Sequence, residues 1–250
     1  MSLFKEIFGR IWAAWSAILF VVTMFIFIIP FLLIRLLPEP RVTHIFIAIS
    51  KLWMQIFLNG IGCHLTVRGR EHFKKGNNYI VICNHNSLMD VPVSCPFIPG
   101  GNKTIAKKEM TRVPVFGMLY AMGSVLVDRK DEKSRRESYA QMKQVLQMGL
   151  HMSIYPEGTR NTTPDPLKPF HDGAFRLAID TGKPIIPSLI FNTKKVLPQH
   201  KTFFVWPHFL EMHFMEPVYL QNDDTVASLK QRIFEQMRDY YVTRRVESSG

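Results

Sequence analysis

Cysteine is scarce in this sequence: only Cys63, Cys83 and Cys95 occur, in largely apolar surroundings. None stands in a Cys-x-x-Cys or His–Cys spacing, so we expect no metal site. An odd number of such cysteines favours reduced thiols, as in a cytosolic setting, over a disulfide framework. The Gly-x-Ser-x-Gly turn that carries the nucleophile of many serine hydrolases is also absent, which argues against that enzyme class.

Acidic residues are few as well: 20 Asp and Glu stand against 31 Lys and Arg, a formal charge of +11. Such a charge suits a polyanionic partner, which could be nucleic acid, anionic lipid or a phosphorylated substrate. No recognised nucleic-acid motif appears, and a nucleic-acid binder would not need the apolar N-terminus described next, so we expect no nucleic-acid partner. A chain of 250 residues has room for one α/β domain and an appendage.

Charge is missing altogether from residues 11–34. As a helix this segment would be about 36 Å long, more than the roughly 30 Å hydrocarbon core of a membrane, so we expect a transmembrane or deeply inserted helix. A cleaved signal peptide is the alternative, but the apolar run is longer than such a peptide has, and no cleavage site of small residues follows it. Arg10 and Arg35 bracket the segment, so charge does not fix its orientation.

A second segment, residues 44–59, is mostly apolar and has four polar residues on one helical stripe. They are His44, Lys51, Gln55 and Asn59. This pattern is typical of a helix that lies in a membrane interface, and a core helix of the following domain is the alternative. We therefore predict two membrane-anchoring helices over residues 1–61 and one soluble domain over residues 62–250.

From residue 78 onward, short apolar runs alternate with helical patterns, which predicts an α/β fold. We expect strands at residues 79–83, 124–127, 152–155, 185–191 and, in one or two pieces, 203–214. We expect helices at residues 134–149, 173–180 and 224–242. Pro187 lies inside one predicted strand, which a sheet tolerates at an edge or a bulge. The tail from residue 247 is expected to be disordered.

His85 and Asp90 offer a base and a carboxylate that could orient it. In a continuous helix, a five-residue step would turn the two side chains roughly 140° apart, so they can meet only if the chain changes direction. A buried strand before residue 84 and a capping-box pattern, Ser87 followed by Asp90, supply that change. A plain helix start explains the same residues, so both interpretations stay open at this point.

Three further clusters stand at or near strand ends, where α/β sheets collect binding residues. Arg129 follows the predicted strand at residues 124–127, and Glu157-Gly158-Thr159-Arg160 follows the one at 152–155. The third cluster, Pro184-Ile185-Ile186-Pro187-Ser188, enters the predicted strand at 185–191. Lys107 lies apart from these clusters, between the His85 motif and the Arg129 motif. Each cluster alone is weak evidence, because a turn after a strand or a solvated cation is common.

In this order the motifs resemble those of the glycerolipid acyltransferases, especially the lysophosphatidic acid acyltransferase type. The resemblance covers roughly residues 62–215. It is carried by Asn84 with His85-x-x-x-x-Asp90, by Gly123 to Arg129, by Glu157-Gly158-Thr159-Arg160 and by Ile186-Pro187. Where the family commonly has basic residues before a glycine, this chain has His171-Asp172-Gly173, which leaves those two positions without the expected phosphate contact.

The resemblance implies a central mixed sheet flanked by helices, as in glycerol-3-phosphate acyltransferases, with an N-terminal membrane platform. It implies that His85 is the general base and that Asp90 holds the imidazole tautomer and stabilises the imidazolium. The implied acceptor-binding residues are Lys107, Arg129, Glu157, Gly158, Thr159 and Arg160. We expect backbone N–H groups near the His85 loop or the helix start to bind the oxyanion.

The implied reaction moves a fatty-acyl group from coenzyme A or acyl carrier protein to the sn-2 hydroxyl of lysophosphatidic acid, giving phosphatidic acid, with no further cofactor. The partners would then be membrane lipids, lysophosphatidic acid and the thioester donor, at the cytosolic side of the cytoplasmic membrane. Glycerol 3-phosphate or another lysolipid is an alternative acceptor. A non-catalytic membrane lipid-binding protein is the alternative of another class, although such a protein has no need of a base.

Overall fold

The computed structural model describes residues 3–247 and begins with two long antiparallel helices, α1 (Leu3–Ile34) and α2 (Arg41–Gly60). Tryptophans join them: the Trp53 indole donates to Thr23 Oγ1 at 2.9 Å, and the Trp12 indole donates to the carbonyl of Ile61 at 2.9 Å. Both helices are long and apolar enough to cross a membrane. The charge-free segment is thus helical as predicted, and the helix starts about two turns earlier.

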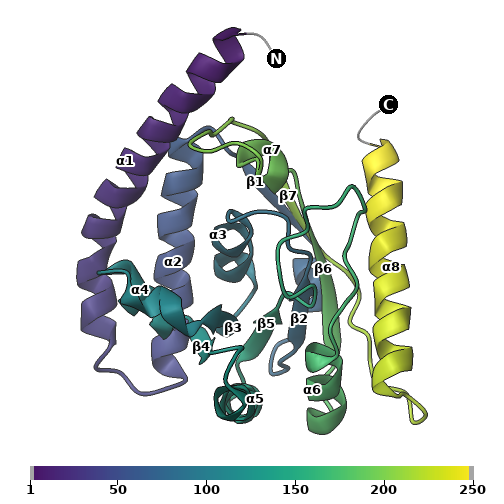
Figure 1. Ribbon diagram of the computed structural model, residues 1–250. Helices are drawn as coiled ribbons and strands as arrows, with labels where there is room; N and C mark the ends of the chain where they lie inside the picture. The colour runs from purple at the N-terminus through teal and green to yellow at the C-terminus, as the bar shows by residue number, and fades with distance from the viewer. Residues whose placement is uncertain (1–2, 248–250) are drawn as a thin grey trace.

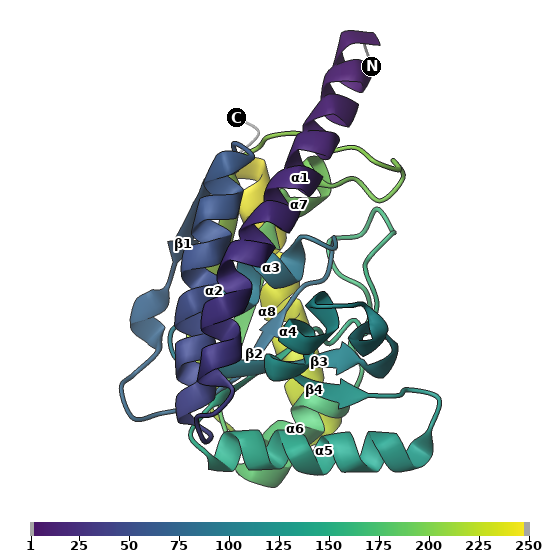
Figure 2. The same cartoon turned by 90° about the vertical axis from the view of Figure 1, so that its left-hand side faces the viewer.

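One face of α1 leaves large apolar side chains exposed along its length. They include Phe4, Ile7, Ile11, Trp15, Ile18, Val22, Phe25, Ile29 and Leu33. Figure 2 shows α1 crossing in front of α2, with its N-terminal end projecting beyond the rest of the molecule. Exposed apolar surface of this extent is typical of a site that contacts a membrane or a partner.

The helix α2 is partly a core helix, which was the alternative interpretation of its pattern. Trp53, Met54, Phe57 and Leu58 are buried, and they belong to a hydrophobic cluster that includes residues of the sheet. The imidazole of His44 accepts the Gly101 N–H at 3.1 Å, so part of the polar stripe also faces the domain. The predicted division of the chain after residue 61 stays a prediction, because the two parts share one apolar core.

The domain is built on a seven-stranded mixed sheet with the order β1-β7-β6-β2-β5-β3-β4. Its strands are β1 (Leu65–Arg68), β2 (Ile80–Cys83), β3 (Asn102–Lys107), β4 (Ser124–Val127), β5 (His151–Ile154), β6 (Ile185–Phe191) and β7 (Leu210–Phe214). The strands β2 to β6 run parallel to one another, while β7 is antiparallel to β6 and parallel to β1. The predicted α/β class with a mixed sheet is confirmed.

Helices cover both faces of this sheet (Figure 1). On one face lie α1, α2, α3 (Asp90–Ser94) and α4 (Phe116–Met122); on the other lie α5 (Glu132–Gln147), α6 (Gly173–Thr181) and α8 (Val226–Glu247). Side chains of β2 alternate between two apolar clusters, Val81 and Cys83 on the α2 side and Ile80 and Ile82 on the α8 side. Such continuous burial explains why the central strands read as unbroken apolar runs.

Four of the strands, β1, β3, β6 and β7, differ in some respect from the sequence prediction. The strands β1 and β3 were not predicted, because their sequences, Leu-Thr-Val-Arg and Asn-Lys-Thr-Ile-Ala-Lys, mix polar and apolar residues. Residues 203–209 are not a strand, since β7 begins at Leu210. Of the two settings expected for Pro187, the sheet edge is wrong, because β6 lies between β7 and β2. The other, a bulge, agrees with the pairing: between the Ile185–Val218 bridge and the Ser188–Phe214 pair, two residues of β6 face three of the opposite segment. The paired register of β6 with β7 begins only at Ser188, so the missing N–H removes no ladder bond there.

The remaining helices agree closely with the prediction. The helix α5 begins two residues before the expected start. The helix α6 ends at Thr181 and is capped by Gly182, which has the left-handed φ of +64° expected of a helix C-cap. The helix α8 buries Leu229, Ile233 and Met237 and runs to Glu247. The rest of the tail that was predicted to be disordered lies outside the described residues.

The connection between β6 and β7 packs on the first turns of α1. It includes the short helix α7 (Thr193–Val196). The N–H of Val205 donates to the carbonyl of Gly9 at 3.0 Å, and the rings of Phe8 and Trp206 meet edge to face at 5.3 Å. The same connection reaches the candidate site, so α1 and the site share a neighbour.

Candidate active site

His85 and Asp90 meet in space, as their spacing allowed. The chain leaves β2 after Cys83, turns through residues 84–89, and enters α3 at Asp90. His85 Nδ1 lies 2.8 Å from Asp90 Oδ2. The loop between strand and helix therefore folds the carboxylate back onto the imidazole, which a continuous helix could not do.

The Asp90 carboxylate is fully buried and is surrounded by donors. Oδ2 accepts from the backbone N–H groups of Asn86 (2.5 Å) and Ser87 (2.7 Å) and faces His85 Nδ1, while Oδ1 accepts from Thr193 Oγ1 at 2.6 Å. An ionised carboxylate can only accept hydrogen bonds, so the group that faces it must be a donor. His85 therefore carries its proton on Nδ1. The other ring nitrogen, Nε2, is then left as the base.

The His85 ring is held on its flat side by Tyr155, whose ring centroid lies 4.5 Å away. The Tyr155 hydroxyl pairs with Ser94 Oγ at 2.6 Å, and burial raises the pKa of Tyr155 well above its usual value. The His85 side chain is 19% exposed, and no hydrogen bond from another described residue occupies Nε2. An oriented imidazole with an accessible basic nitrogen is suited to accept a proton from a bound hydroxyl.

Glu157 fixes the backbone of His85 from the next strand of the sheet. Its Oε1 accepts the His85 N–H at 2.7 Å and its Oε2 accepts the Lys168 N–H at 3.0 Å, with 1% of the residue exposed. Burial raises the pKa of Glu157, against the lowering effect of these two N–H groups. The N–H of Asn161 donates to the carbonyl of His85 at 2.6 Å. Glu157 and Asn161 thus bind the N–H and the carbonyl of His85, respectively.

The predicted cations gather at the same edge of the sheet. The guanidinium of Arg129 donates to the carbonyl of Gly158, and Lys168 Nζ donates to Thr159 Oγ1 at 2.7 Å. Arg160 and Lys107 are exposed, and neither side chain has a hydrogen bond or ion pair with another described residue. The structure therefore joins Arg129, Glu157, Gly158 and Thr159 to the His85 loop, and it places Arg160 beside them. Lys107 lies at the end of β3, without a contact to the others.

A model of the acyltransferase family matches residues 64–190, the span that contains these motifs. This chain belongs to that acyltransferase family. The observed fold also matches the crystal structure of the 1-acyl-sn-glycerophosphate (LPA) acyltransferase PlsC from Thermotoga maritima, with a TM-score of 0.82 at 20% identity, over 96% of this chain and 98% of that one. At this identity the likeness concerns the fold.

Curated relatives share part of the sequence. The chain is 36% identical over 135 residues to a 1-acyl-sn-glycerol-3-phosphate acyltransferase of Cocos nucifera, covering 53% of this chain and 43% of that protein. It is 31% identical over 138 residues to the enzyme of the same name from Borreliella burgdorferi, covering 53% of each chain. The chain thus spans about half the length of these relatives. A longer alignment, 28% identical over 195 residues, joins it to the alpha enzyme of Mus musculus.

The backbone N–H groups nearest the His85 imidazole are already used. The N–H of His85 donates to Glu157, those of Asn86 and Ser87 donate to Asp90, and that of Met89 donates to Ser87 Oγ at 3.3 Å. The expectation that oxyanion donors come from the His85 loop is therefore wrong for these four groups. The predicted capping box is also only half formed, because the Ser87 side chain does not cap α3 and instead donates to the carbonyl of Leu197 at 3.1 Å.

Several residues that shape the candidate site were not found by the sequence analysis. Asn84, noted only for its place beside His85, makes two hydrogen bonds with the backbone of Ile190 on β6, at 3.0 and 2.7 Å. Gln199 donates to the carbonyl of Asn86, and Thr193 to Asp90. An apolar run that ends in a polar residue was the available signal for Asn84. Thr193 and Gln199 lie more than a hundred residues from their partners, and nothing local marks them.

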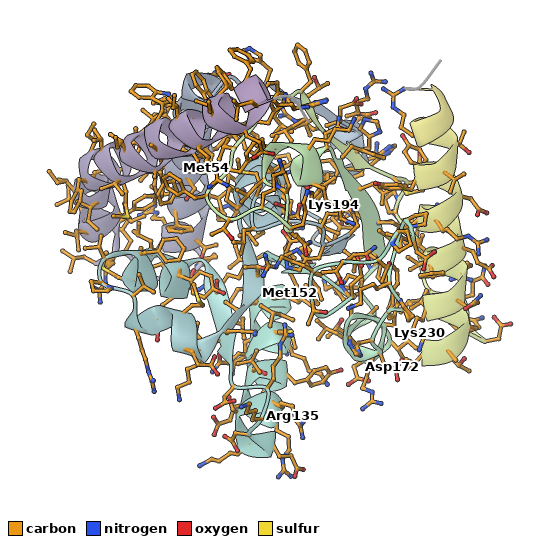
Figure 3. All side chains as sticks on the ribbon, turned by 45° about the horizontal axis from the view of Figure 1, so that its top comes forward. Met54, Arg135, Met152, Asp172, Lys194 and Lys230 are labelled. Atoms are coloured by element: carbon orange, nitrogen blue, oxygen red, sulfur yellow. The ribbon has the colours of Figure 1, made fainter. Side chains whose placement is uncertain are left out.

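The family departure at residues 171–173 has a structural explanation. The His171 ring packs under Gly158, where an added Cβ would lie 2.7 Å from it, and the Gly158 φ of +70° also favours glycine. Asp172 pairs with Lys230 of α8 at 2.6 Å, as Figure 3 shows, and this hydrogen bond lowers the pKa of Asp172. These two side chains support the Glu157 turn and dock α8, which is consistent with the absence of a phosphate contact there.

Proposed function

We propose that this acyltransferase transfers a fatty-acyl group from a thioester to the sn-2 hydroxyl of lysophosphatidic acid and so makes phosphatidic acid. The observation that carries the proposal is the His85–Asp90 pair, with Nδ1 bound to the carboxylate and Nε2 left accessible. A lipid-binding protein has no need of an oriented base, which argues against a non-catalytic role.

The proposed mechanism follows from the proton positions. His85 Nε2 takes the proton of the acceptor hydroxyl while its oxygen attacks the thioester carbonyl carbon. Asp90 stabilises the imidazolium that forms. The tetrahedral intermediate then expels the thiolate, which receives the proton from His85, so that ester and thiol are the products. The reaction needs no acyl-enzyme and no cofactor beyond the coenzyme A or acyl carrier protein thioester.

A phosphorylated acceptor is supported by the cations beside the base. Arg160 has no ion pair within the described chain, and it lies between Thr159 and Asn161, whose N–H contacts His85. A guanidinium can donate two parallel hydrogen bonds to a phosphate. We propose that Arg160 is the main phosphate ligand, that Arg129 supports it, and that Lys107 contributes charge from the end of β3. The curated relatives named above carry the same acceptor in their names.

A membrane setting is supported by the exposed apolar face of α1. An acceptor with one acyl chain resides in the bilayer, and an enzyme that lies against the bilayer can take it from there. We propose attachment to the cytoplasmic membrane with the site on the cytosolic side. The three free, buried cysteines are in keeping with a reducing compartment.

The test is an acceptor and donor panel with the full-length protein in membranes. Lysophosphatidate, other lysolipids and glycerol 3-phosphate are offered separately, each with acyl-coenzyme A and with acyl-carrier protein. We expect the highest kcat/KM with lysophosphatidate. Equal or faster transfer to glycerol 3-phosphate, or no transfer to any acceptor, would contradict the proposal.

Arg160→Ala is expected to raise KM for lysophosphatidate at least about tenfold, the scale of a charge-assisted hydrogen-bond pair, with a smaller change in the donor KM. The matched control is Arg136→Ala, an exposed arginine of α5 that, among the described residues, forms an ion pair with Glu132 alone, at 3.4 Å. The two Michaelis constants are measured separately. If Arg160→Ala changed only the preference for acyl-chain length, the phosphate assignment would be wrong.

A further inference from the structure

Thr193 touches the proposed catalytic pair from the opposite side of the carboxylate. Its hydroxyl donates to Asp90 Oδ1 at 2.6 Å, and the residue is fully buried. The other carboxylate oxygen, Oδ2, is engaged by three N–H groups of the His85 loop. Of the described residues, only Thr193 donates a hydrogen bond to Oδ1. The carboxylate therefore accepts hydrogen bonds at both oxygens, and at Oδ1 it depends on the hydroxyl of Thr193.

The position of Thr193 is fixed by the end of β6. Asn192 adopts a left-handed φ of +68°, which turns the chain out of the strand and into α7, and its side chain donates to the carbonyl of Phe209 at 3.1 Å. Just before this corner, the two hydrogen bonds between Asn84 and Ile190 lock β6 to the loop that carries His85. His85 follows the end of β2 and Thr193 follows the end of β6, and the Asn84–Ile190 hydrogen bonds join these two strand ends.

The hydroxyl satisfies the buried oxygen Oδ1 of the Asp90 carboxylate. A buried acceptor that loses its only donor is strongly destabilised, because no water replaces the lost bond. Without Thr193, Oδ1 would have no donor, and rotation of the carboxylate would let it compete with Oδ2 for the three N–H groups. The His85 ring would then lose its single orientation, and with it the fixed place of Nε2.

We propose that Thr193 is a positioning residue, which holds Asp90 so that Asp90 can hold His85. This inference rests on the proposed function for its kinetic effect, and on the geometry alone for its effect on the imidazole. Thr193 is fully buried and offers no surface to a substrate, so its loss should slow the chemical step and leave acceptor binding unchanged. Thr193 thereby extends the His85–Asp90 pair to a chain of hydrogen bonds from hydroxyl to carboxylate to imidazole. Its members come from two distant parts of the sequence.

The kinetic test compares Thr193→Val, which keeps the shape, with Thr193→Ser, which keeps the hydroxyl. Thr193→Val is expected to lower kcat at least about tenfold with the acceptor KM within about twofold, the scale of one hydrogen bond to a buried charge. Thr193→Ser is expected to recover most of that loss. The matched control is Thr43→Val, a buried threonine whose hydroxyl donates to the Glu39 carboxylate at 2.7 Å, and it should retain full activity.

A spectroscopic test does not depend on turnover. In protein labelled with ¹⁵N-histidine, the His85 signal is identified by its loss in His85→Ala and should show the proton on Nδ1 alone. Thr193→Val is expected to give a mixture of tautomers, while Thr43→Val should not. A wild-type tautomer together with wild-type kcat in Thr193→Val would overturn the inference. If the wild-type protein transfers no acyl group at all, the proposed function fails, and the tautomer measurement still decides on Thr193.

Discussion

Replacing His85 with alanine is expected to reduce acyl transfer to lysophosphatidate by at least about a hundredfold, because a positioned general base contributes on the order of 10²–10⁴-fold. The fold should survive the change. The imidazole makes one hydrogen bond, to Asp90, and that carboxylate keeps three other donors from Asn86, Ser87 and Thr193. The loss should therefore appear in kcat with little change in thermal stability, measured by assay of membranes and by the unfolding temperature of purified protein.

The control for this experiment is a second histidine that pairs with a carboxylate outside the candidate site. His72 also pairs with a carboxylate, Glu216, at 3.5 Å, and its side chain is likewise 19% exposed, but it lies beside β1 at the far edge of the sheet. His72→Ala should retain near-normal turnover. Turnover of His85→Ala near that of the wild type would remove the base from the mechanism, whatever the acceptor.

The His85–Asp90 contact could be predicted because both of its causes are local. The apolar run before residue 84 marks a strand end, and the polar residues after it mark a change of direction. The central strands β2, β5 and β6 were accessible for the same reason, since burial on both faces makes them continuously apolar. By contrast, Asn102 and Thr104 of β3 are buried polar residues, so no apolar pattern marks that strand.

The residues that support the site could not be predicted from the sequence. Thr193 and Gln199 contact the His85 loop from 103 and 113 residues away, through a connection with little regular structure. A threonine after a strand is ordinary by itself, and only the fold shows that its hydroxyl faces Asp90. Glu157 was expected to shape the acceptor pocket; its carboxylate instead receives two backbone N–H groups, so in this structure its visible contribution is to position His85.

These contacts explain how an irregular loop can hold the His85 imidazole in a fixed position. Residues 84–89 form neither helix nor strand, yet the loop is bound by β6 through Asn84, by the turn after β5 through Glu157 and Asn161, and by Gln199. Three separate parts of the chain thus fix one histidine. Catalytic groups need such support, because small displacements of a base lower the rate.

Replacing Asp90 with asparagine is expected to lower kcat by on the order of 10²–10⁴-fold, by analogy with the aspartate of other base–carboxylate pairs. Here the change separates charge from orientation. An amide can keep its oxygen toward the three N–H groups and turn its NH₂ toward Thr193 Oγ1, which can accept as well as donate. The imidazole would keep its place and its Nδ1 proton, and only the negative charge that stabilises the imidazolium would be lost.

Three measurements together decide what Asp90 contributes: the kcat of Asp90→Asn, its acceptor KM and its His85 tautomer. Asp180→Asn is the matched control, because that surface carboxylate also accepts from a hydroxyl, Tyr139 at 3.0 Å, and from Lys143 at 2.7 Å. A large fall in kcat with an unchanged tautomer means that the charge of Asp90 dominates. A large fall with a changed tautomer means that Asp90 acts mainly by orienting His85. An Asp90→Asn protein with wild-type kcat would exclude the pair as the catalytic unit.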